Sequence, residues 1–325
     1  MNEDEVRSST IFLVKHGSVA YGTNTPTSDV DEKGVAVPRG REYYYGPKTF
    51  EQKDSGWEDG HDRCIYDLRK FISLAKDCNP NIVEVLYVDK ADRIKVTNVG
   101  DALLGMRSMF LSQKAAKTFV GYAVAQLHRI HGHHKWLNSP PKEPVESDFT
   151  KTHYLSRAET PWKRKFSGHE IHIDSETENY VTIKHIDHEA FDAAKKDWKN
   201  YQDWKAKRNP ARATIEAKYG YDTKHAYHLV RLLRMGSEIL RDGSVVVKRP
   251  DKDELLDIRH GKYTYQELLV MAEDLKADVD RTLISSPLPK EVDMEEINKK
   301  QMDIIDICIN HPNWAYQELP EWVNW

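Results

Sequence analysis

Two aspartates that are two positions apart follow a Gly-Ser pair near the amino terminus of the chain. Gly17 and Ser18 close a short apolar run, and ten residues separate Ser18 from the segment's first aspartate in Ser28-Asp29-Val30-Asp31. A Gly-Ser turn at a helix start offers backbone N–H groups and a hydroxyl to a phosphate. Alternate residues of a strand share a face, so Asp29 and Asp31 would present two carboxylates together. Such a pair suits one or two Mg²⁺ ions that keep positions open for substrate phosphates.

Taken together, these residues describe an anion cradle beside a divalent-cation site, the apparatus of phosphoryl or nucleotidyl transfer. An Asp-x-Asp pair also occurs in ordinary solvated turns, so the metal site is a motif hypothesis that needs structural context. A calcium loop is excluded. Gly34 fits the sixth position of such a loop, but Gly40 stands where its twelfth ligand, a glutamate, is needed, and Lys33 stands at the fifth position.

The elements that must position these residues read as α/β in the first third of the chain. Short apolar runs bounded by turn residues indicate strands at Ile11–Val14, Val30–Val37 and Cys64–Tyr66. A helix-period segment follows, and its shared face comprises Leu68, Phe71, Ile72 and Ala75. Asn79-Pro-Asn81 then breaks the chain before a further apolar segment.

From about Asp101 the periodicity is helical. We expect a helix capped by Ser112 that ends near Gly132, a loop-rich insertion with a small hairpin within Ile171–Ile186, and a helix over Phe191–Lys205. The fold class expected is α+β, with a small mixed sheet and helices in a head at 1–100. A mostly helical domain at 101–325 follows, with the insertion at about 138–200.

Composition bounds the class of protein. The 325 residues carry 48 Lys and Arg against 52 Asp and Glu, so no strong overall field attracts nucleic acid or an anionic membrane. The acidic start, the absence of a long apolar run and three cysteines without a C-x-x-C pair favour a cytoplasmic protein with no membrane partner. The sequence does not indicate an oligomeric state.

The head motifs resemble the nucleotidyltransferases of the DNA polymerase beta superfamily. The closer resemblance is to a bacterial and phage branch of predicted nucleotidyltransferases, some of which lie beside RNA ligases and are assigned to RNA repair. The matching head segments are Gly17-Ser18, Ala20-Tyr21-Gly22, Ser28-Asp29-Val30-Asp31 and Gly34-Val35. Further matches are Tyr66-Asp-Leu-Arg-Lys-Phe71, Asn79-Pro-Asn81 with Glu84, Phe119-Val-Gly-Tyr122, Arg208-Asn-Pro210, Tyr221–Leu233 and Glu238-Ile-Leu240.

The resemblance implies a third carboxylate from a neighbouring strand. Asp62 is our choice, because strand alternation would put its side chain on the face shared by Cys64 and Tyr66. Asp67 is a rival, but it stands where a helix N-cap is expected. Glu84 is a weaker alternative.

A cationic row is expected on the helix over Asp222–Leu240. Ala226, Leu229, Val230, Leu233, Ser237 and Leu240 would form its inward stripe. Lys224, His228 and Arg231 follow one another at steps of four and three on the other side. Across a cleft from the aspartates, this row would bind a triphosphate; the alternative is an ordinary solvated face.

The sequence therefore predicts a metal-dependent nucleotidyltransferase that uses a nucleoside triphosphate and Mg²⁺ or Mn²⁺. Asp29, Asp31 and Asp62 would hold the metal, and Gly17, Ser18 and Ser28 would lie at the nucleotide with the cationic row. The acceptor, an RNA or tRNA end, is implied by the resemblance alone. A protein-modifying nucleotidyltransferase and a nucleotide-binding regulator without turnover stay open as alternatives.

Overall fold

The computed structural model describes residues 1–26, 28–156, 171–177 and 179–310. Its contacts divide the chain into two compact units, which we call unit 1 (Met1–Ile130 and Thr223–Trp325) and unit 2 (His131–Asp222). The domain boundary expected at residue 100 stays a prediction. Among the described residues, no helix is both long enough and apolar enough to cross a membrane.

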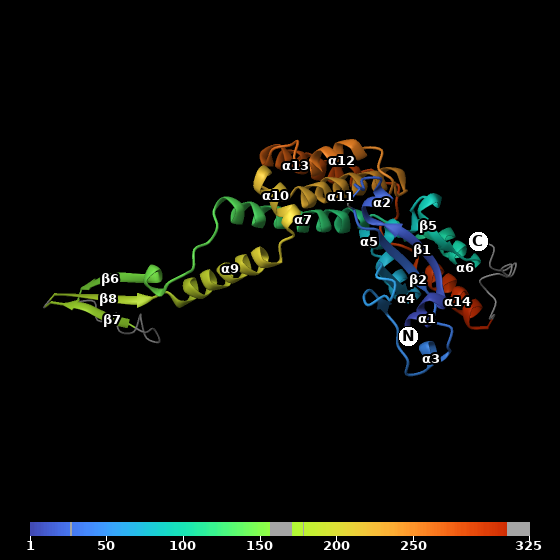
Figure 1. Ribbon diagram of the computed structural model, residues 1–325, viewed down its shortest axis with the longest axis horizontal. Helices are drawn as coiled ribbons and strands as arrows, with labels where there is room; N and C mark the ends of the chain where they lie inside the picture. The colour runs from blue at the N-terminus through green and yellow to red at the C-terminus, as the bar shows by residue number, and fades with distance from the viewer. Residues whose placement is uncertain (27, 157–170, 178, 311–325) are drawn as a thin grey trace. The chain divides into compact units, whose positions relative to one another are not determined.

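Unit 1 contains a five-stranded mixed sheet in the order β3-β4-β2-β1-β5. Figure 1 labels three of its strands, β1, β2 and β5. β2 and β4 pair in parallel, and the other neighbours are antiparallel. The strands are β1 (Thr10–His16), β2 (Asp31–Ala36), β3 (Gln52–Lys53), β4 (Asp62–Asp67) and β5 (Arg93–Val96). This sheet, with the helical remainder, confirms the expected α+β class.

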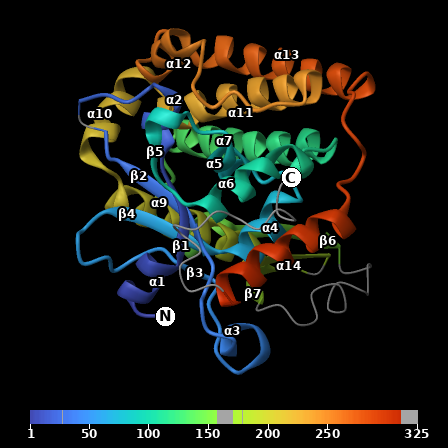
Figure 2. The ribbon, with the colours of Figure 1, turned by 90° about the vertical axis from the view of Figure 1, so that its right-hand side faces the viewer.

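Helices of unit 1 cover the sheet and form a helical layer beyond it. The described α-helices are α1 (Glu3–Ser9), α2 (Gly17–Tyr21), α3 (Glu42–Tyr45), α4 (Leu68–Ala75), α5 (Pro80–Leu86), α6 (Asn98–Gly105), α11 (Thr223–Asp242), α12 (Lys252–Arg259), α13 (Tyr265–Ile284) and α14 (Met294–Asn310), together with most of α7 (Lys114–Asn138). Two short 3₁₀ helices are η1 (Lys90–Asp92) and η2 (Arg107–Phe110). Figure 2 shows α11, α12 and α13 side by side.

Local chemistry explains where the helices around the sheet begin. Asp67 caps α4 by accepting from the backbone N–H of Arg69, which confirms the capping role expected for it. Asn79 caps α5 in the same way, and Pro80 occupies the first turn, where its missing N–H costs nothing. The four apolar residues expected on one face of α4 are all buried.

Unit 2 contains an antiparallel sheet in the order β6-β8-β7. Its strands are β6 (Thr150–Ser156), β7 (Ile171–Glu176) and β8 (Tyr180–Ile186), and its helices are η3 (Glu146–Phe149), α9 (His188–Lys207), α10 (Pro210–Tyr219) and the end of α7. The hairpin expected within Ile171–Ile186 is confirmed. Strand β6 was not expected, and α7 ends at Asn138 rather than near Gly132.

Candidate active site

Strand register brings Asp31 and Asp62 together. Asp31 is the first residue of β2 and lies opposite Asp62, the first residue of the parallel strand β4. On its other side, Asp31 lies opposite His16, the last residue of β1. Directly paired residues point to the same face, and neighbouring strands are about 4.8 Å apart. One edge of the sheet therefore presents a row of His16, Asp31 and Asp62.

The burial pattern of β4 supports the choice of Asp62 as the third carboxylate. Asp62 is exposed, and Cys64 and Tyr66 are half-buried on its face, whereas the alternate residues are buried. Its two rivals have other contacts: Asp67 caps α4, and Glu84 is fully buried in an ion pair. Among the three, Asp62 is the carboxylate that faces solvent beside Asp31.

The other half of the aspartate pair lies outside the strand. We expected Asp29 and Asp31 to share a strand face, but β2 begins only at Asp31, so that expectation is wrong. Asp29 is exposed, and its charge contributes to the raised pKa of Asp31, which places it within electrostatic reach. Ser28 shapes the preceding turn, because its hydroxyl accepts from the backbone N–H of Thr25 at 2.8 Å.

Asp31 lies between charges of both signs. Burial raises the pKa of Asp31 above 3.8, and the neighbouring carboxylate of Asp62 raises it further. The ammonium groups of Lys224 and Lys33 act in the opposite direction. Although α11 is far from β2 in the sequence, Lys224 thus lies within electrostatic reach of Asp31. That it forms a basic wall for a triphosphate stays a prediction.

Gly17 brings the first turn of α2 against Asp31. A Cβ atom built on Gly17 would lie 2.3 Å from Asp31 Oδ2, so a side chain there would displace the Asp31 carboxylate. The backbone of Gly17 also has φ of +64°, a conformation that favours glycine. Ser18 follows directly, and its carbonyl accepts from the N–H groups of Gly22 and Thr23, which closes the turn.

Lys33 is a cation of this site that sequence reasoning missed. It lies two positions after Asp31 and therefore on the same face, opposite Val14 and Cys64 on the neighbouring strands. Its ammonium group donates to the carbonyl of Asn81 at 3.2 Å. Burial lowers the pKa of Lys33, and the charges of Glu84, Cys64 and Asp31 oppose that effect. Alternation counted onward from Asp31 would have identified it.

The expected cationic row on α11 is only partly correct. Lys224 is exposed, and His228 is half-buried with its ring 4.7 Å from that of Tyr227. Burial, followed by the charges of Arg231 and Lys224, lowers the pKa of His228 well below 6.5, so its imidazole is neutral at pH 7. Arg231 is buried with 4% exposure, so it does not lie on a solvated face, the alternative weighed for this row. That Arg231 contacts a triphosphate stays a prediction.

Arg231 instead joins three helices at a buried cluster. Its Nη1 donates to Glu84 Oε1 at 2.6 Å, and Glu84 is fully buried on α5. The guanidinium carbon also lies 3.9 Å from the centre of the Tyr21 ring, at the end of α2, and the Tyr21 hydroxyl donates to the other oxygen of Glu84. The cluster therefore ties α11 and α5 to the helix that begins at Gly17.

Comparison with known proteins supports this reading of the head. Residues 2–155 match the model of the RNA repair pathway DNA polymerase beta family. An uncharacterized 38.9 kDa protein from the nrdC-mobD intergenic region of Enterobacteria phage T4 is 23% identical over 300 residues, which cover 83% of this chain and 88% of that protein. No solved structure matches the chain. The matched residues, slightly less than half of the chain, carry the Gly-Ser turn and all three aspartates, so the similarity to this family covers the candidate site.

Proposed function

We propose that the chain is a metal-dependent nucleotidyltransferase that moves a nucleoside monophosphate from a nucleoside triphosphate to a hydroxyl at an RNA end. The observation that carries the proposal is the in-register pairing of Asp31 with Asp62, with the Gly17 turn packed against Asp31. The description of the family as part of an RNA repair pathway supports RNA as the acceptor.

The carboxylates at and beside this edge of the sheet have the donor chemistry that Mg²⁺ or Mn²⁺ would need. Asp29, Asp31 and Asp62 offer carboxylate oxygens, the ligands that hard divalent cations prefer. Burial raises the pKa of Asp31 most, the negative charges of Asp62 and Asp29 raise it further, and a bound cation would relieve their repulsion. A bound divalent ion would neutralise charge on the triphosphate and polarise its phosphoryl oxygens.

Other residues of the chain would bind the phosphates, stabilise the leaving group and accept the proton. Gly17 lets a phosphate approach the first turn of α2, where backbone N–H groups and the Ser18 hydroxyl can donate to it. Lys33 and Lys224 supply positive charge that attracts the triphosphate and also stabilises the pyrophosphate that leaves. In the transfer, the acceptor oxygen forms a bond to the α-phosphorus while the bond between that phosphorus and the α–β bridging oxygen breaks. The hydroxyl proton passes to the exposed carboxylate of Asp62.

The test is transfer of label from α-³²P nucleoside triphosphates by the purified full chain with Mg²⁺ or Mn²⁺. RNA oligonucleotides with free hydroxyl ends and whole-cell protein are offered in separate reactions. Asp31→Asn and Asp62→Asn are compared with the control Asp257→Asn. Asp257 is a surface residue of α12 that forms an ion pair with Lys262, just after the helix. We expect the wild-type chain to label RNA. Both site variants should label it at least about a hundredfold less, and the surface variant should label it as the wild-type chain does.

Each other outcome identifies an alternative. Label on a protein band would replace the RNA acceptor by a protein hydroxyl. Triphosphate binding without transfer to either acceptor would favour a regulator without turnover. Label on RNA that Asp31→Asn retains in full would contradict the proposed metal site.

A further inference from the structure

The strand register that pairs the site aspartates also pairs two opposite charges on the other face of the sheet. Glu32 directly follows Asp31, Arg63 directly follows Asp62, and these two residues also lie opposite each other. Arg63 Nε donates to Glu32 Oε2 at 2.6 Å. Their side chains are only 9% and 7% exposed, so this cross-strand ion pair is buried.

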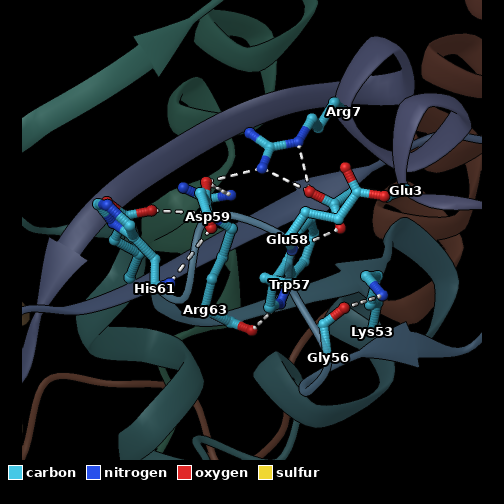
Figure 3. A network of polar contacts seen from close by, with 10 residues as sticks. Glu3, Arg7, Lys53, Gly56, Trp57, Glu58, Asp59, His61 and Arg63 are labelled. Atoms are coloured by element: carbon cyan, nitrogen blue, oxygen red, sulfur yellow. Dashed lines mark hydrogen bonds and ion pairs between the residues drawn. The ribbon is translucent and has the colours of Figure 1, made fainter.

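The loop before β4 closes over the buried pair from outside (Figure 3). The indole N–H of Trp57 donates to the backbone carbonyl of Arg63 at 2.6 Å, and the guanidinium lies 4.8 Å from the Trp57 ring. Asp59 accepts from Arg63 at 3.1 Å and from Arg7 of α1 at 2.7 Å. His61 Nδ1 lies 3.1 Å from Glu32 Oε1. Arg63 is therefore held through its backbone and its side chain.

Like charges directly opposite each other on neighbouring strands are destabilising, and opposite charges are stabilising. Before a cation binds, Asp31 and Asp62 repel each other at the first residues of β2 and β4. The Glu32–Arg63 pair lies one residue further along the same two strands. Its attraction holds β2 and β4 together against the repulsion between Asp31 and Asp62. Breaking one side of a buried pair leaves an uncompensated charge, so the arrangement resists local change.

We propose that Glu32 and Arg63 are positioning residues that fix the separation of the Asp31 and Asp62 carboxylates for a divalent cation. The inference rests on the proposed function, because it assumes that these carboxylates hold the metal. Ligands held in place before binding give higher affinity than ligands that must be brought together against their own repulsion. Arg63 and Glu32 lie on the opposite face of the sheet from Asp31 and Asp62, so their influence on the metal would act through the spacing of the strands.

The experiment measures Mn²⁺ binding to the full chain without nucleotide, by loss of the free-ion signal in electron paramagnetic resonance. Arg63→Met and Glu32→Gln are expected to weaken Mn²⁺ binding about tenfold, and Arg63→Lys is expected to recover part of the loss. The matched control is Arg208→Met, which breaks another ion pair of a buried glutamate, Arg208 with Glu216 in unit 2. This control should leave Mn²⁺ affinity unchanged.

The outcomes separate the inference from the function on which it rests. If the wild-type chain neither binds Mn²⁺ nor transfers a nucleotide, the proposed function fails. If the wild-type chain does both, and folded Arg63→Met and Glu32→Gln bind Mn²⁺ as tightly as it does, the positioning role is overturned. Circular dichroism establishes folding, and Glu32→Gln decides alone if Arg63→Met is unfolded, because the amide keeps the shape of the carboxylate.

Discussion

Arg231 of α11 and Glu84 of α5 form an ion pair in which both side chains are at most 5% exposed. Tyr21, the last residue of α2, completes the contact from a third helix by donating to Glu84 and lying against the guanidinium. The helix that begins at Gly17 is therefore anchored at its other end by two charges from the body of unit 1. This gives Arg231 a structural role where a nucleotide contact was expected.

Replacing Arg231 by Met should lower the free energy of unfolding of the chain. The substitution leaves the fully buried Glu84 carboxylate without its cation, which typically costs about 3–5 kcal/mol. Urea denaturation should show that loss, and Glu84→Gln added to Arg231→Met should restore part of it, because the glutamine carries no charge. A variant with wild-type stability and a weakened affinity for triphosphate would instead assign Arg231 to the nucleotide.

The spacing of α11 explains why the sequence was misleading at Arg231. Steps of three and four placed Arg231 in a row with Lys224 and His228, opposite an apolar stripe. In the structure most of α11 after its first turn is buried, because α12 and α13 pack on it and Glu84 of α5 contacts it as well. Periodicity identifies one buried face, and it cannot show that the polar side meets a buried carboxylate from a distant helix.

Period-two alternation was more informative for the sheet. It selected Asp62 from its place relative to Cys64 and Tyr66, and the face assigned to Asp62 is confirmed by the burial pattern of β4. The parallel pairing of β2 with β4 depends on the fold of the intervening segment, so the contact between Asp31 and Asp62 was beyond local patterns. β5 was missed because its four residues include two cations and form the edge of the sheet.

Replacing Asp31 by Asn should stabilise the metal-free chain at pH 7. Burial and the Asp62 carboxylate raise the pKa of Asp31 above 3.8, so the folded chain holds this proton more tightly than the unfolded chain. Stability contributed by the protonated form is therefore lost as the pH rises from 3.8 through the raised value. The gain at pH 7 should stay below about 1 kcal/mol at this half-buried position, and it should vanish near pH 3.

Thermal melts at several pH values check this sign. Added Mg²⁺ should reverse the order at pH 7, because only the wild-type chain gains about 2.7 kcal/mol at a hundred times its dissociation constant. Equal stabilisation of Asp31→Asn by Mg²⁺ would show that the ion binds elsewhere.

Replacing Gly17 by Ala should abolish transfer activity, and Gly22→Ala provides the matched control. Both glycines have positive φ, +64° and +71°, so each substitution carries a similar backbone cost of about 1–2 kcal/mol. A Cβ at Gly17 would meet Asp31 Oδ2 at 2.3 Å, whereas one at Gly22 has only ordinary contacts at 3.8 Å and beyond. The two variants should have similar melting temperatures, but only Gly17→Ala should lose Mn²⁺ binding and transfer. Equal transfer activity in the two variants would show that the Gly17 turn does not contribute to the carboxylate site.

Replacing Lys33 or Lys224 by Gln should raise the KM for the triphosphate about tenfold, a loss of about 1.4 kcal/mol in binding. Both ammonium groups lie close enough to Asp31 to lower its pKa, and a triphosphate at the Gly17 turn would come within their reach. Lys262→Gln is the control, since that lysine is exposed and pairs with Asp257. The site variants should also show a weaker dependence of KM on salt than the wild-type chain, because each removes one charge that attracts the substrate. An unchanged KM with a reduced kcat in Lys33→Gln would assign this lysine to the leaving pyrophosphate in the transition state, where it would not contribute to ground-state binding.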